Sequence, residues 1–226
     1  NFYAKHTEKQ HPGGATFQKF SVFLDNNRVP YVFGDIADNK SICAIFKKNG
    51  EDFDSVTLRL PTTRTANFKS SLAFDTYNNP YFSFVQAGGT DPEIGFCKLT
   101  GSDFTNTGDW QFTLLEKLDP FNEGFRANVD RDSRIKINSN NEKFILTSRS
   151  DFSPSSARTG EYLLFHNNGI DDDTNVNNWD KYVFDGGSRG TWYEDFEMEL
   201  NNDGKPAIAY TVPLSANNYY GIKYKE

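Results

Sequence analysis

Apolar and polar residues alternate along this chain in short runs, which are separated by turns rich in Asn, Asp and Gly. Alternation with a period of two predicts β-strands that bury one face. An alternating strand, a polar turn and a second strand recur four times, over residues 21–36, 71–86, 134–149 and 198–212. Each copy therefore predicts a β-hairpin.

The four hairpins share a turn signature, an Asp or Asn five residues before a Pro position. The pairs are Asp25 and Pro30, Asp75 and Pro80, Asn138 and Lys143 (where the Pro is lost), and Asn201 and Pro206. Asp and Asn favour turns because their side chains hydrogen-bond the backbone two residues further on. A signature at regular spacing indicates an internal repeat.

Further strands complete each repeat. Two follow each of the first three hairpins, over 41–48 and 54–60, 93–99 and 109–115, and 161–167 and 178–184. One strand follows the fourth hairpin, over 218–226, and one precedes the first, over 1–6. Four antiparallel strands per repeat form the blade of a β-propeller. We therefore predict one domain over 1–226, an all-β propeller of four blades of four antiparallel strands.

Ring closure follows from the two unpaired strands. If the strand over 1–6 became the outer strand of the last blade, the ring would close and no sheet edge would stay open. The alternatives are a five-bladed ring with one degenerate copy and a fragment of a larger propeller.

The unit SLAFDTYNNPYFSF over 71–84 resembles the repeats of secreted propellers, including propeller lectins and sialidase-like proteins. A ring of four blades is similar in architecture to hemopexin-type domains. The resemblance implies a secreted or cell-surface protein. The sialidase-type Asp box, Ser-x-Asp-x-Gly-x-Thr-Trp, does not occur in the sequence, so the resemblance carries no catalytic residue to this chain.

Composition agrees with this class. Aromatic residues make up 15% of the chain, which suits half-buried sheet faces. A net charge of −7 argues against non-specific nucleic-acid binding, and no apolar run is long enough to span a membrane. The two cysteines, Cys43 and Cys97, are too few for a disulfide framework; they are either buried free thiols or one bridge.

Arginines recur just before the inner strands of three repeats. Arg64 precedes Asp75 by 11 residues, and Arg126 and Arg189 precede Asn138 and Asn201 by 12. The loops that carry them reach the end of the propeller where ligands usually bind. Guanidinium groups bind carboxylate, sulfate or phosphate in two-pronged fashion, so together they would form an anion site. The alternative is ion pairing with nearby acidic residues.

Aromatic residues near the same loops would stack on sugar rings, or else pack between blades. They are Trp192, Tyr193, Tyr219 and Tyr220.

At the opposite end, Asp171, Asp173 and Asn175 alternate like the first ligands of a calcium loop. The loop lacks the turn glycine and the final bidentate Glu, so a solvated turn is the alternative. We expect no other cofactor.

The leading hypothesis is a glycan-binding, lectin-like module for neutral or acidic saccharides. A protein-interaction scaffold and a glycan-active hydrolase or lyase are the alternatives, and the sequence favours a protein without catalytic activity because no catalytic motif is present. The expected partner is a carbohydrate or glycoconjugate, with a protein partner as the alternative.

Overall fold

The structure, a computed structural model, describes residues 17–36, 42–59, 66–67, 71–86, 93–117, 133–150, 159–188, 196–213 and 220–225. Within these ranges the chain forms β-strands and two single-turn 3-10 helices, η1 (Thr107–Asp109) and η2 (Val176–Asn178). No helix in this part of the chain is long and apolar enough to cross a membrane.

The strands group into four antiparallel sheets. Sheet 1 contains β1 (Phe17–Leu24), β2 (Pro30–Ile36), β3 (Ile42–Asn49) and β4 (Asp52–Arg59). Sheet 2 contains β5 (Ala66–Asn67), β6 (Leu72–Phe74), β7 (Pro80–Gln86), β8 (Glu93–Leu99) and β9 (Trp110–Lys117). Sheet 3 contains β10 (Ser133–Ile137), β11 (Lys143–Ser150), β12 (Thr159–Asn167) and β13 (Asp180–Ser188). Sheet 4 contains β14 (Phe196–Leu200), β15 (Pro206–Pro213) and β16 (Tyr220–Lys225).

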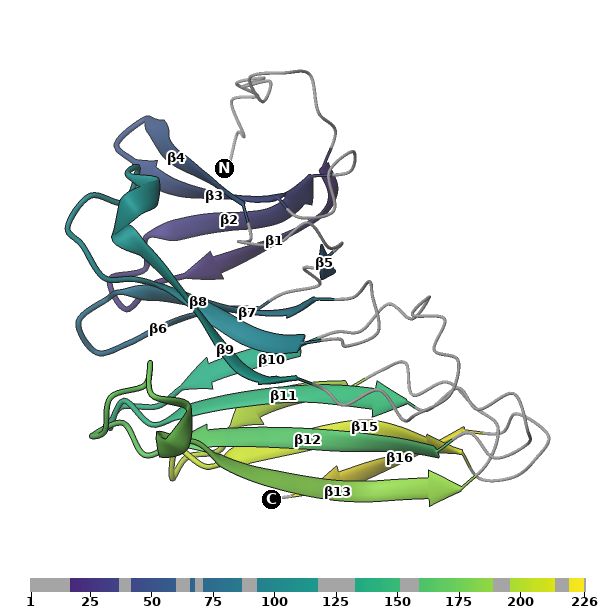
Figure 1. Cartoon of the computed structure of the whole chain (residues 1–226). Coiled ribbons are helices and arrows are strands. Elements are labelled where there is room, and N and C mark those ends of the chain that lie inside the picture. The colour runs from purple at the N-terminus through teal and green to yellow at the C-terminus, as the bar shows by residue number, and fades with distance from the viewer. Residues whose placement is uncertain are drawn as a thin grey trace.

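The strand order confirms the predicted repeat. In sheets 1, 3 and 4 each strand pairs with the next one along the chain, and in sheet 2 the short β5 and β6 both pair with β7 as an interrupted first strand. The four sheets follow one another in chain order, and sheets 1 and 4 lie well apart (Figure 1). This is a propeller-like arrangement of four blades.

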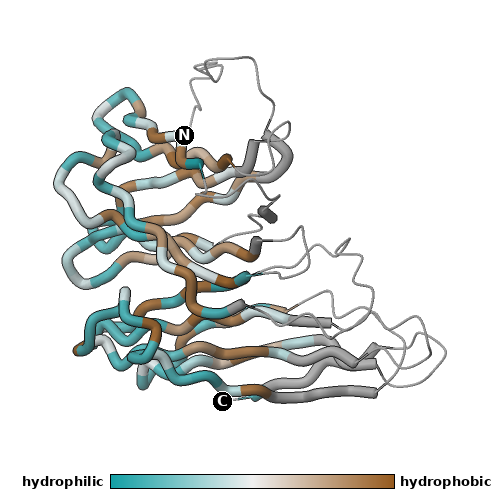
Figure 2. The backbone as a smooth tube through the Cα atoms, in the orientation of Figure 1, coloured by the Kyte–Doolittle hydropathy of each residue, from teal (hydrophilic) through white to brown (hydrophobic). Residues whose placement is uncertain are grey.

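Apolar side chains between neighbouring sheets form the core. Three clusters of buried residues join sheets 1 and 2, sheets 2 and 3, and sheets 3 and 4. Aromatic pairs bridge each junction: Phe33 with Phe82 at 5.1 Å between ring centroids, Phe96 with Trp179 at 5.4 Å, and Tyr162 with Tyr210 at 4.8 Å. Hydrophobic positions lie along the strands and hydrophilic ones in the turns at one end of the sheets (Figure 2). The sheets are therefore held face to face by side chains of alternate strand positions.

The signature Asp or Asn organises each hairpin turn. In the first turn, Asp25 Oδ1 accepts hydrogen bonds from the backbone N–H groups of Asn27 (2.9 Å) and Val29 (2.8 Å). The other three turns repeat this pattern through Asp75, Asn138 and Asn201. Because an amide oxygen accepts as a carboxylate does, Asn and Asp interchange at this position.

Successive turns are also bonded to each other. Asn78 Oδ1 accepts from Asn26 N (3.0 Å), and Asn141 Oδ1 accepts from Thr76 N (2.8 Å). Asn78 and Asn141 have left-handed backbone angles, φ 70° and φ 62°, which Asn tolerates better than most residues. The turns thus add a polar row along one end of the stacked sheets.

Both cysteines are free and buried, which confirms the first of the two predicted alternatives. The predicted strand over 1–6 and its pairing with the last sheet lie outside the described residues, so ring closure stays a prediction. Of the residues described, no buried cluster joins sheet 4 to sheet 1.

Asp75 provides a test of the turn signature. Replacing Asp75 with Ala removes the acceptor of two backbone N–H groups and of Asn79 Nδ2, and we expect the free energy of unfolding to fall by about 1–3 kcal/mol. Urea unfolding measures the change. Asp75→Asn is the matched control, since two repeats carry Asn there, and it should lose less than half as much. Equal stability of Asp75→Ala and the unmodified chain would contradict this role.

Candidate functional site

The predicted anion and sugar site falls outside the described residues, except for the backbone of Tyr220. Arg64, Arg126, Arg189, Trp192, Tyr193 and Tyr219 lie outside the described residues, as does the side chain of Tyr220, whose backbone begins β16. The calcium-loop residues and the spaces between the sheets belong to the described part of the chain, and these define the candidate site below.

Two of the spaces between sheets are filled by a tryptophan. Trp110 begins β9 and packs between sheets 1 and 2, where its indole N–H donates to Phe104 O (3.1 Å). Trp179 directly precedes β13 and packs between sheets 2 and 3, where its indole N–H donates to Asp173 O (2.8 Å). In both cases the loop before the fourth strand supplies the side chain that closes the space toward the preceding sheet.

Asp173 lies in the second of these spaces and is buried among cations. Lys98 Nζ donates to Asp173 Oδ1, Tyr81 OH donates to Oδ2 (3.1 Å), and Lys143 Nζ lies 3.4 Å from Oδ2. Burial, followed by the negative charge of Asp173, raises the pKa of Tyr81 well above its ordinary value. The phenol therefore stays protonated and acts as a donor to the carboxylate.

The predicted calcium ligands take separate roles in this loop. Asp171 is exposed and accepts from Asn168 Nδ2 (2.8 Å), while Asn175 caps η2 by accepting from Asn177 N (3.1 Å). Asp173 turns inward to the two lysines. No group of three or more His, Cys, Asp or Glu side chains that could hold a metal ion occurs in the described segments. Calcium binding here would require Asp173 to leave its lysine partners.

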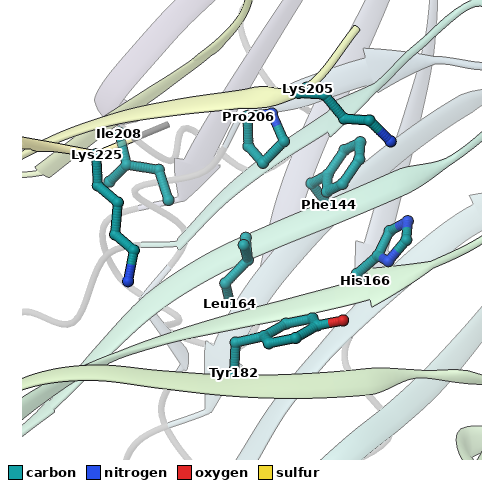
Figure 3. A pocket seen from close by; sticks show the side chains of 8 residues that line it. All are labelled: Phe144, Leu164, His166, Tyr182, Lys205, Pro206, Ile208 and Lys225. Atoms are coloured by element: carbon teal, nitrogen blue, oxygen red, sulfur yellow. The ribbon is translucent and has the colours of Figure 1, made fainter.

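The space between sheets 3 and 4 contains a pocket instead of a tryptophan. Sheet 4 has three described strands, so no fourth-strand loop from it fills this space among the described residues. The pocket has a volume of about 340 Å³, within the size range of small-molecule sites. Its lining comes from facing positions of both sheets (Figure 3): Phe144, Leu164, His166, Tyr182, Lys205, Pro206, Ile208 and Lys225.

Aromatic and cationic groups dominate the pocket walls. The rings of Phe144 and His166 stack in parallel with 4.7 Å between centroids, and the ring of Tyr182 is half exposed. Lys205 and Lys225 lie at opposite ends of the pocket (Figure 3). None of the described lining residues is Asp or Glu. Such a surface suits a planar or ring-shaped ligand that carries negative charge.

His166 lines the pocket and has one ring nitrogen without a hydrogen bond. Its Nε2 is buried and makes no hydrogen bond, and it lies 3.8 Å from Glu142 Oε1. Lys205 Nζ lies 3.8 Å from the other oxygen of Glu142. Buried polar atoms are nearly always hydrogen-bonded, so an unbonded nitrogen beside a pocket indicates a position for a ligand oxygen or a water.

Sequence reasoning did not single out these pocket residues. A partial signal was present, because Trp110 and Trp179 occur at equivalent places, at or directly before the fourth strands of the second and third repeats. Among the described residues, no equivalent tryptophan lies between sheets 3 and 4.

Comparison with known proteins supports the fold. The chain is similar in structure to an endo-arabinase from Bacteroides thetaiotaomicron VPI-5482, with a TM-score of 0.54 and 16% identity. The likeness covers 95% of this chain and 76% of the other. No protein-family model and no curated protein sequence matches the chain. At this identity the likeness establishes a shared fold, and the structural neighbour is a glycan-active enzyme.

Replacing Asp173 tests whether its carboxylate anchors the loop before β13 between sheets 2 and 3. Asp173→Ala would leave Lys98 and Lys143 buried without a counter-charge, and we expect the free energy of unfolding to fall by about 3–5 kcal/mol. Asp171→Ala, two residues away on the exposed side, should change it by about 0.5 kcal/mol or less. Chemical denaturation of both variants measures the difference. Equal losses would show that Asp173 does not hold the loop between sheets 2 and 3.

Proposed function

We propose that this chain is a glycan-binding, lectin-like propeller that recognises acidic saccharides, acting as a secreted or cell-surface module. The fold shared with a glycan-active enzyme supports a carbohydrate ligand. Fold alone does not define function, so the proposal is based on the chemistry of the pocket between sheets 3 and 4.

That pocket is the observation that carries the proposal. It is large enough for a short saccharide, and Tyr182 gives it an aromatic wall against which a pyranose ring can stack. The ammonium groups of Lys205 and Lys225 favour a ligand that carries carboxylate or sulfate groups. The buried Nε2 of His166 gives a ring hydroxyl a hydrogen-bond partner.

The arginines that recur in the sequence extend this proposal. Arg64, Arg126 and Arg189 recur at equivalent positions of three repeats, and Trp192, Tyr193, Tyr219 and Tyr220 lie near the same loops in the sequence. Repeated weak sites on one module increase the apparent affinity for a polymeric ligand. We propose that the loops carrying these residues contact further anionic units of the same glycan.

Hydrolysis is less well supported than binding. Glycosidases of the common kind use two carboxyl groups that flank the scissile bond, and the lining of the described pocket has none. An apolar patch that would suit a protein partner lies elsewhere, on β1.

Binding of a uronic-acid trisaccharide, measured by isothermal titration calorimetry, tests the pocket. A neutral trisaccharide of the same linkage is the comparison ligand. Tyr182→Ala removes the stacking wall and Lys225→Met removes one ammonium group, and each should weaken binding of the acidic trisaccharide roughly tenfold, or about 1.4 kcal/mol. Only Lys225→Met should reduce the preference for the acidic over the neutral ligand.

Lys181→Met is the matched control for the pocket. Lys181 precedes Tyr182 but pairs with Glu116 of sheet 2 on the opposite face of β13, with 2.8 Å between Nζ and Oε1. Its replacement should leave the affinity unchanged. If Tyr182→Ala and Lys225→Met bind as tightly as Lys181→Met, the pocket is not the ligand site.

Binding of a longer acidic glycan tests the role of the three recurring arginines. Replacing Arg64, Arg126 and Arg189 together with Ala should leave binding of the trisaccharide unchanged and weaken binding of a polymeric uronate at least tenfold. Surface plasmon resonance on the immobilised polymer gives both values. Unchanged binding to the polymer would remove the arginines from the proposal and leave the pocket intact.

A further inference from the structure

One position on the first strand of each sheet is buried in three sheets and exposed in sheet 1. Counted from the turn signature, Val22 of β1 corresponds to Leu72 of β6, Ile135 of β10 and Met198 of β14. The last three are 5%, 0% and 0% exposed, because each packs against the preceding sheet. Val22 is 62% exposed. Sheet 1 therefore presents a face that the repeat normally covers with another sheet.

Two more apolar residues extend the exposed face. Phe20 and Leu24, two positions to either side of Val22, are 69% and 59% exposed. Alternate residues of one strand point to the same side, so the three side chains form one apolar strip. Three large apolar residues exposed together on one strand indicate an interaction surface.

The turn of sheet 1 also lacks a described neighbour on this side. Asn78 and Asn141, the left-handed residues of the second and third turns, each bond the turn before their own. Arg28 is the equivalent residue of the first turn, with φ 60°, and its exposed side chain has no partner among the described residues. Within the described residues, the exposed face of sheet 1 thus ends in a guanidinium group without a partner.

Sheet 4 presents the complementary free face. At the positions of β15 that face away from sheet 3 it has the small residues Ala207 and Ala209, both partly exposed. Its turn carries the exposed Asp203, whereas Glu197 and Glu199 of its first strand already pair with Arg134 and Lys136 of sheet 3. The two small residues complement the bulky strip of sheet 1 in size, and Asp203 complements Arg28 in charge.

We propose that these two faces bind each other between two copies of the chain, with sheet 1 of one copy packed on sheet 4 of the next. The contact would repeat the junction that occurs three times within the chain. Two copies are required because sheets 1 and 4 of one copy lie well apart (Figure 1). A head-to-tail contact forms a closed ring when the rotation between copies brings the last copy back to the first. Two copies in such a ring would have eight blades, which is within the range known for propellers.

Sedimentation velocity across a range of protein concentrations tests the contact. The unmodified chain should form dimers, and Val22→Asp should weaken the dimer at least tenfold because it places a carboxylate in the apolar strip. Ser21→Asp is the matched control. Ser21 is also exposed on β1 but points to the other side of the strand, so this variant should dimerise normally. Far-ultraviolet circular dichroism verifies that all variants are folded.

Exchanging the charges of Arg28 and Asp203 gives a second test of the dimer, because both side chains are exposed and can be changed without unfolding the chain. Arg28→Glu and Asp203→Arg should each weaken the dimer, and the two changes in one chain should restore it, since each copy then offers the reversed pair. A chain that is monomeric at every concentration overturns the proposal. So does a dimer that Val22→Asp leaves intact, or a charge exchange without recovery.

Discussion

Burial of alternate side chains between adjacent sheets is the constraint on which the whole structure depends. A strand presents one set of residues to the sheet before it and the other set to the sheet after it. In sheet 2, Phe82 packs toward sheet 1 while Tyr81, its neighbour, packs toward sheet 3. Both faces of an internal sheet are therefore apolar, and a neighbour on either side stabilises it.

This constraint also explains where the open surfaces lie. Internal junctions are closed by three means: inner-strand residues such as Ile135, ring contacts between middle strands, and a tryptophan before the fourth strand. Among the described residues, the junction of sheets 3 and 4 has the first two features and no such tryptophan, and the pocket lined by Tyr182 lies there. The outer face of sheet 1 has none of the three in the described part of the chain, and the strip around Val22 is exposed there.

The polar interactions position these surfaces. Asp173 anchors the loop between sheets 2 and 3 through Lys98, Lys143 and Tyr81, where a lone carboxylate would be too costly to bury. Along β10 and β14, Arg134 and Lys136 pair with Glu197 and Glu199, which aligns sheet 4 with sheet 3. Exposed pairs of this kind contribute little stability, so their main effect is on register.

The sequence by itself determined the strands, their order within each sheet and the turn residues, because these depend on alternation and on the local hydrogen bonds of Asp25 and its equivalents. For Cys43 and Cys97 it left buried free thiols or one bridge, and the structure has buried free thiols. The tertiary structure decided which charges meet and which spaces stay open. Asp173, which resembles a calcium ligand in its alternating loop, meets two lysines from other strands, and the pocket combines residues from Phe144 to Lys225. Contacts between sheets join residues that are far apart in the chain, and the local pattern of polar and apolar residues does not show which of them meet in space.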